Sequence, residues 1–213
     1  MKKFAQFLIF ACVVLTLPAA SVLRAQREAD ANSAARYLSV HEPELNQTET
    51  PSKRLFLLLK LAPAALAAGE NEKARTYSSE LMALGESQKS SSPGFGPSMY
   101  SDATHIGNLV LGELALTDGD VAKAKEHLLA AGDVPGSSVL NSFGPNMLLA
   151  KELLARGERD VVIQYLVACS KFWKMQDGKL EQWKKIIAQG GTPDFGPNLM
   201  TGLANWRFDK KPA

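Results

Sequence analysis

Three short turns divide the central part of the sequence, and each consists of a glycine followed by an acidic residue. They are Ala68-Gly69-Glu70, Asp118-Gly119-Asp120 and Arg156-Gly157-Glu158. In each case an apolar segment ends at the glycine, which can take the left-handed conformation that closes a helix. The acid then lies at the start of the next helix, where it meets the positive end of the helix dipole. The pattern predicts three helix–turn–helix hairpins.

Aligning the three turn glycines brings small and medium-sized residues into register on both sides of the turn. Small residues at fixed places allow the two helices of a hairpin to approach closely. Ala, Leu, Lys and Glu dominate the chain after Pro51, and β-branched alternation is absent, so we predict an all-α fold. The aligned sets are Leu61, Leu111 and Leu149; Ala62, Gly112 and Ala150; Ala74, Ala124 and Val162; Ser78, Leu128 and Leu166; and Leu81, Ala131 and Cys169.

Residues 105–135 carry the most complete version of this pattern. Its matching positions are Asn108, Leu111, Gly112, Ala124, Ala131 and Pro135. This stretch resembles the tetratricopeptide repeat (TPR) family, although Ala115 and Leu128 stand where that family usually has aromatic residues. The turn glycines lie 50 and 38 residues apart, in contrast to the regular 34-residue spacing of the family. The sequence therefore indicates degenerate repeats with inserts, or a generic array of α-hairpins.

The resemblance implies a TPR-like α-solenoid, an array of helix-turn-helix hairpins with extra C-terminal helices. In that family the first helices line a concave groove that binds peptides or partner proteins. The register places in this groove Ile106, Leu109, Glu113 and Leu116 from one unit, and Met147, Lys151 and Leu154 from the next. The groove holds an extended partner segment in one interpretation and is covered by the chain's own C-terminal helices in the other.

The N-terminus has the features of a secretory signal peptide over residues 1–25. Lys2 and Lys3 precede an apolar run over residues 7–17, and small residues follow. We expect cleavage near Ala25 or Ser21 and an exported protein, periplasmic or secreted. The alternative is an uncleaved membrane anchor over residues 4–23, which would make the protein a membrane-tethered envelope assembly subunit. Only in that case does the sequence predict a membrane partner.

Removing residues 1–25 removes three basic residues and no acids, so the net charge changes from +2 to −1. A near-neutral chain lacks the basic surface that nucleic-acid binding requires. We therefore expect a protein or peptide partner and no nucleic acid.

The remaining organisation is predicted from helix patterns and breakers. Residues 26–52 have the composition of a polar linker with a short helix at 29–38, residues 53–206 form the helical-repeat domain, and residues 207–213 are a tail. Pro63 predicts a kink or break near Leu61. Further helices are expected over 158–175, 179–188 and 197–206.

The tripeptide Phe-Gly-Pro occurs at 95–97, 143–145 and 195–197. With Gly as N-cap and Pro as first helical residue, each copy fits a helix start. The preceding Phe would pack on the fourth helical residue, which is Tyr100, Leu148 or Met200. This interpretation predicts helices that open near Pro97, Pro145 and Pro197, and it weakens the case for the three Phe residues as ligand contacts.

No motif for catalysis, metal binding or cofactor binding is found. The histidines are His41, His105 and His127, and after signal removal one cysteine remains, Cys169, at a packing position. Paired-Cys and HExxH spacings are missing, and the glycines at 107 and 112 lack the lysine of a phosphate loop. We therefore expect a non-catalytic interaction protein, with an enzyme carrying an unrecognised site on a helical scaffold as the competing class.

Residues 171–185 combine five lysines with Phe172, Trp173 and Trp183. One interpretation is a helix face packed inward with solvated lysines outside. The other is contact with an anionic membrane surface or an acidic partner.

Overall fold

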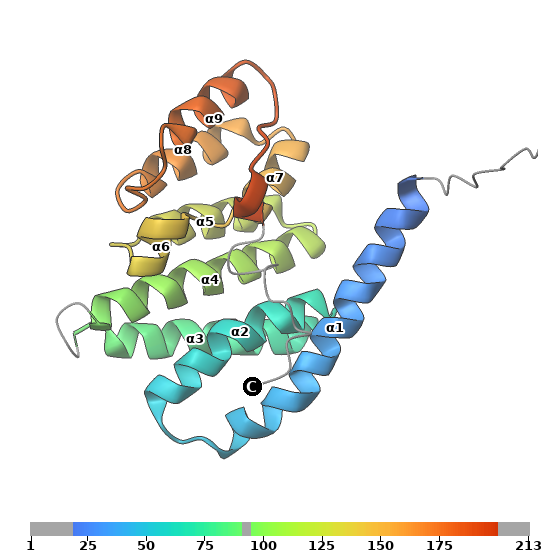
Figure 1. Cartoon of the computed structure of the whole chain (residues 1–213), viewed down its shortest axis with the longest axis vertical. Coiled ribbons are helices and arrows are strands. Elements are labelled where there is room, and N and C mark those ends of the chain that lie inside the picture. Colours follow the sequence, from blue (N-terminus) through green and yellow to red (C-terminus); the bar gives the residue numbers. More distant parts are fainter. Residues whose placement is uncertain (1–18, 91–94, 200–213) are drawn as a thin grey trace, which may run out of the picture.

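The computed structural model describes residues 19–90 and 95–199, and in this part of the chain every regular element is a helix (Figure 1). The all-α prediction is thereby confirmed. The predicted signal up to residue 18, the closing helix beyond Leu199 and the tail 207–213 lie outside the described residues. The elements are α1 (Ala19–Gln47), α2 (Pro51–Ala67), α3 (Asn71–Gln88), α4 (Phe95–Thr117), α5 (Val121–Gly132), α6 (Ser138–Phe143), α7 (Leu148–Ala155), α8 (Arg159–Cys169), α9 (Lys179–Ala188) and a 3-10 turn, η1 (Gly196–Leu199).

The three predicted turn glycines have the left-handed conformation, with φ of 77° at Gly69, 82° at Gly119 and 85° at Gly157. The Gly69 N–H donates to the carbonyl of Leu66 at 3.0 Å, and the Glu70 N–H donates to that of Ala65 at 2.9 Å. The equivalent two bonds close the other turns at 2.8–3.2 Å. This is the Schellman arrangement, which satisfies the last carbonyls of each first helix. The turns thus join α2 to α3, α4 to α5 and α7 to α8.

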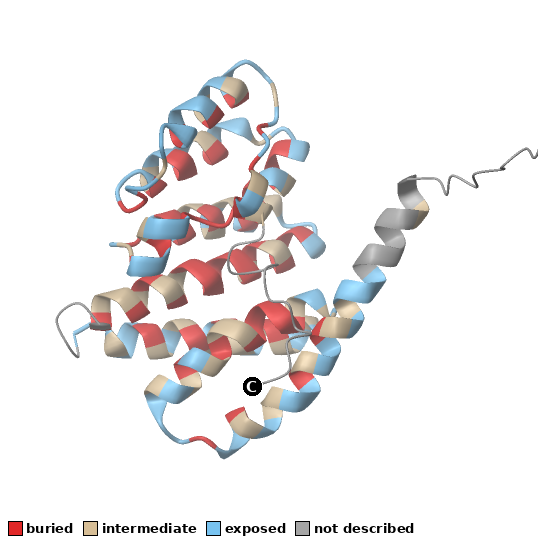
Figure 2. Ribbon diagram, viewed as in Figure 1, coloured by how far each residue is buried: buried red, intermediate tan, exposed pale blue. Residues whose placement is uncertain are grey.

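Each hairpin packs against the next one, and the aligned small residues form the contacts. Helix α3 packs on α4, α5 packs on α8, and α2, α4 and α7 contact one another in that order. The fifteen aligned residues are buried apart from Leu111, which is half-buried. At Gly112 a methyl group would collide with the side chain of Leu149, so the glycine is what allows α4 and α7 to approach. Buried residues lie along the helix sides that face neighbouring helices (Figure 2).

Residues 26–47 form most of α1, which contains the short helix predicted over 29–38, and the rest of the predicted polar linker is wrong except for residues 48–50. The helix continues through Pro43 because its C-terminal half packs on α2 through Leu38 and Leu45. The Glu42 carboxylate also contacts Lys73 Nζ at 3.0 Å and accepts from the Tyr77 hydroxyl at 3.0 Å, both on α3. Tertiary packing therefore outweighs the local sequence.

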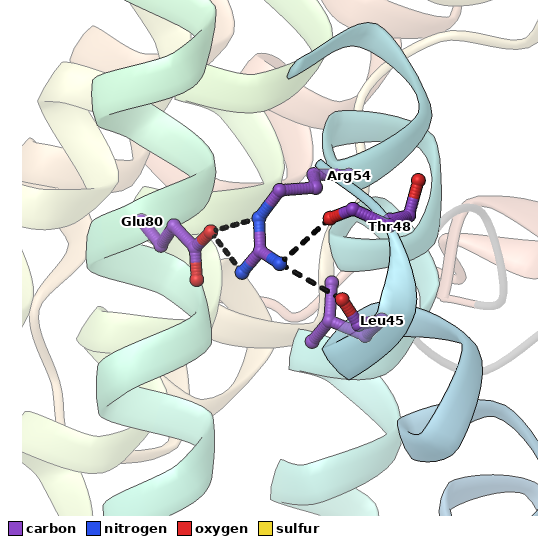
Figure 3. Close-up of polar contacts among 4 residues, drawn as sticks. All are labelled: Leu45, Thr48, Arg54 and Glu80. Atoms are coloured by element: carbon purple, nitrogen blue, oxygen red, sulfur yellow. Dashed lines mark hydrogen bonds and ion pairs between the residues drawn. The ribbon is translucent and has the colours of Figure 1, made fainter. Parts of the chain in front are cut away.

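The end of α1 is held by Arg54 of α2, whose side chain lies between Glu80 and the carbonyl groups of Leu45 and Thr48 (Figure 3). The N-terminal part of α1 extends beyond the other helices (Figure 1). Among the described helices, none combines the length and the apolar character that crossing a membrane requires.

Two further expectations about helix ends are corrected. The predicted break near Pro63 is wrong, because α2 runs unbroken from Pro51 to Ala67 and buries Pro63 among apolar neighbours. The helix predicted over 158–175 ends at Cys169. Beyond the helix end, the Lys174 N–H donates to the Asn141 side chain of α6 at 3.0 Å. Helix α9 has the predicted bounds.

The three Phe-Gly-Pro copies differ in structure. The first opens α4, as predicted, and the third opens η1, with Phe195 buried against Trp183. The second copy ends a helix, and the prediction that it begins one is wrong. Phe143 is the last residue of α6, Gly144 with φ of 81° closes that helix, and α7 begins only at Leu148.

Candidate functional site

The apolar residues predicted for the binding groove lie in the core. Leu109 and Met147 have no exposed surface, Leu154 is 6% exposed and Leu116 is 8% exposed. Ile106 is also buried. These side chains therefore hold α4 and α7 in the helix stack, and a partner could reach them only after rearrangement.

The two charged residues predicted for the groove are placed differently. Lys151 of α7 is exposed, whereas Glu113 of α4 is half-buried and its Oε1 atom is shielded from solvent with no hydrogen-bond partner. Burial, helped by the neighbouring Glu152 and opposed by Arg156, raises the pKa of Glu113 to about 7. A buried carboxylate oxygen without a partner is costly and calls for an explanation.

The buried polar groups around His105 have structural partners. The ring Nδ1 of His105 lies 2.8 Å from the carbonyl oxygen of Ala131, and Nε2 accepts from the Asn146 N–H at 3.3 Å. The Tyr165 hydroxyl donates to the Asn146 carbonyl at 2.9 Å. Burial lowers the pKa of His105 to about 4, so the ring is neutral at physiological pH. The cluster ties α4, α5 and α8 to the loop before α7.

His105, His127 and Cys169 are each held in the fold by burial or by a hydrogen bond. His105 is 1% exposed, and His127 is tied to the Asn108 side chain at 2.9 Å. Burial raises the pKa of the Cys169 thiol far above its usual range, which makes the thiol unreactive. Within the described ranges, no cluster of His, Cys, Asp and Glu could hold a metal ion.

Two of the hollows lined by described residues contain no histidine. The larger has a volume of about 590 Å³ and lies between α5 and α8, where Lys125 Nζ pairs with Glu158 at 2.7 Å. The smaller has a volume of about 400 Å³ and lies beside α6. Its lining includes Ser138, Asn141, Lys171 and Lys174.

Beside the smaller hollow, α6 and the chain after α8 expose three large apolar side chains. Phe143 is 65% exposed, Met175 is 61% exposed and Val139 is 55% exposed. Phe143 was expected to pack on Leu148, because the three Phe-Gly-Pro copies share the same local sequence. Its exposure was therefore not predicted. The signal for α6 was Ser137, whose hydroxyl accepts from the Leu140 N–H at 3.0 Å as an N-cap and so marks a helix before Gly144.

Comparisons of the chain with protein-family models, with curated proteins and with solved structures found no match.

Proposed function

We propose that this chain is an exported, non-catalytic TPR-like α-solenoid that binds a protein or peptide segment on the face formed by α4 and α7. The three identically closed hairpins and the successive packing of α2, α4 and α7 support the repeat architecture. In such an array the first helices share one surface, which is suited to extended segments.

The observation that carries the proposal is the unpartnered Oε1 atom of Glu113. Because the atom is shielded from solvent, a bound segment would pair with it only after a local side-chain rearrangement, and a backbone N–H or a cationic side chain of the segment would then satisfy it. Exposed Lys151 on α7 and Arg156, directly after it, supply basic groups for an acidic residue of the same segment. The face formed by α4 and α7 thus carries an acidic and two basic side chains next to buried apolar residues.

The second candidate function, a membrane-tethered assembly subunit, is favoured by the extension of α1 beyond the body. A helix projecting in this way would hold the hairpins at a distance from a membrane anchored before residue 19. The mass of the N-terminus of the purified protein separates the two: cleavage near Ala25 supports the exported form, and an intact Met1 supports the tethered one.

The binding face is tested with a photo-crosslinking amino acid at position 151, in the protein expressed in its native compartment. The matched control carries the same group at Lys185 of α9, which is also exposed. We expect specific adducts from position 151 that weaken in the Glu113→Gln background. Equal labelling at both positions, or labelling unaffected by Glu113→Gln, would contradict the proposed face.

A further inference from the structure

Helix α6 presents an apolar ridge that the rest of the described chain leaves open. Val139 and Phe143 are four residues apart and so lie on one side of the helix. Met175 lies beside the same helix, since its N–H donates to the Asn141 carbonyl of α6 at 3.4 Å. All three side chains are more than half exposed. An exposed aromatic with two apolar neighbours is unusual for a solvated surface and typical of the centre of an interface.

The backbone beneath this ridge is fixed. The Phe143 carbonyl accepts from Asn198 Nδ2 at 3.0 Å, and a methyl group on Gly144 would collide with the Trp173 ring. At the other end of α6, the Ser137 hydroxyl donates to Asp102 of α4 at 2.5 Å. A partner would therefore meet an aromatic side chain on an ordered support, which lowers the entropic cost of binding.

The surroundings of the ridge are basic. Residues 134–147 carry no charged side chain, whereas residues 171–185 carry five lysines against two acids. Lys171 and Lys174 line the hollow of about 400 Å³ together with Ser138 and Asn141 of α6. Lys171 pairs with Asp133 at 3.1 Å, but both side chains are more than 60% exposed. Such exposed pairs are weak, so Lys171 can exchange Asp133 for another acid.

We propose that the ridge of Val139, Phe143 and Met175, with Lys171 and Lys174, docks an acidic amphipathic segment of a partner protein. The apolar side of the segment would cover Phe143, and its carboxylates would enter the hollow beside Lys174. This surface is separate from the face with Glu113 and extends the proposed function to a second site.

A protein segment is favoured over an anionic membrane by the position of α6. In Figure 1, α6 lies at the left edge of the molecule, whereas α1 extends to the right toward the N-terminus. A membrane that held the N-terminus would therefore face the other side of the protein. The hollow beside the ridge also suits discrete side chains better than a flat lipid surface.

The test measures binding of the purified chain, lacking residues 1–25, to a synthetic amphipathic peptide with Leu and Phe on one side and Glu on the other. The control peptide has Lys in place of each Glu. We expect saturable binding of the acidic peptide alone, with NMR shifts centred on α6. Phe143→Ser and Lys174→Glu should each weaken it about tenfold, as for residues central to an interface. Val167→Ser and Lys123→Glu, at exposed positions outside both proposed sites, are the matched controls.

Three outcomes would overturn the proposal. The first is equal affinity for the two peptides. The second is unchanged binding by a Phe143→Ser variant whose circular dichroism is unchanged. The third is Phe143-dependent binding to vesicles of phosphatidylglycerol and phosphatidylcholine that is stronger than binding to the peptide. The Glu113→Gln variant should bind the acidic peptide normally, so failure at this surface is distinguished from failure of the α4–α7 face.

Discussion

The guanidinium group of Arg54 on α2 contacts Oε1 of Glu80 on α3 through two nitrogens, with Nε at 2.7 Å and the second at 2.5 Å. Its third nitrogen donates to the carbonyl of Leu45 at 2.8 Å and to that of Thr48 at 3.2 Å. One side chain thus joins the first hairpin to the end of α1 (Figure 3).

Arg54→Lys should loosen α1, because an ammonium group cannot reproduce the planar fork that serves Glu80 and two carbonyls. We expect a loss of about 1–2 kcal/mol in the free energy of unfolding. Amide exchange over residues 38–47 should become faster than in the rest of the chain. The control is Lys53→Ala, since the Lys53–Glu44 pair at 3.1 Å is solvent-exposed and its loss should leave stability nearly unchanged. Equal effects of the two variants would show that Arg54 does not anchor α1.

The buried His105 should make the fold sensitive to acid. Its pKa is lowered to about 4 by burial, so the unfolded state binds the proton more tightly and stability falls as the pH drops below about 6.5. His105→Asn removes this penalty. The stability advantage of the wild type over the variant should shrink by about 1 kcal/mol between about pH 7 and about pH 5.5. Urea titrations at both pH values check this, and the neighbouring Asp102 titrates in both proteins. A constant difference between the proteins would contradict a buried neutral imidazole.

Glu113 should have the opposite effect on the pH dependence. Its pKa is raised to about 7, so the folded state holds the proton more tightly and stability falls as the pH rises from about 4.5 toward 7. Glu113→Gln removes that loss. The free energy of unfolding of the variant, relative to that of the wild type, should therefore increase by about 2 kcal/mol between about pH 5 and about pH 8. The charged groups that act on Glu113 are Glu152 and Arg156 of α7, and both remain in the variant. An increase in stability that does not depend on pH would show that the pKa of Glu113 is not raised in the folded state.

Gly144 and Gly119 provide a matched pair of left-handed glycines. A methyl group at Gly119 meets open space, and Gly119→Ala should cost about 1 kcal/mol through backbone strain alone. At Gly144 the added methyl group also collides with Trp173, so Gly144→Ala should cost at least about 2 kcal/mol. Urea midpoints measure both, and tryptophan fluorescence should change only in Gly144→Ala. Equal losses of stability in the two variants would mean that the Trp173 ring moves aside without an energetic cost.

The hairpins could be predicted from sequence because the signal is local. Gly69, Gly119 and Gly157 carry their own conformational preference, and small residues at fixed distances from them are sufficient to identify packed helix faces. The bounds of α9 are equally local, since Gly178 precedes an amphipathic stretch that ends at Ala188.

The length of α1, the end of α6 and the packing of the predicted groove depend on contacts between residues that are far apart in the sequence. α1 persists through Pro43 because α2 and α3 hold it, and no window of residues 26–47 contains that information. Gly144 is as compatible with a helix end as with a helix start, and apart from the Ser137 N-cap it is the contacts with Trp173 and Asn198 that fix it as a helix end. The register placed Leu109 and Met147 on the correct helices, but it could not distinguish a groove from a packed contact.

The extension of α1 has a consequence for processing of the N-terminus. The described side chains that α1 buries are Ala34, Leu38 and Leu45, all in its second half. The described side chains at 28–30 are exposed, so the part of α1 that covers the hydrophobic surface of α2 begins after them. A peptidase acting near Ala25, the site expected from the sequence, would cut before the turns that seal one end of the stack.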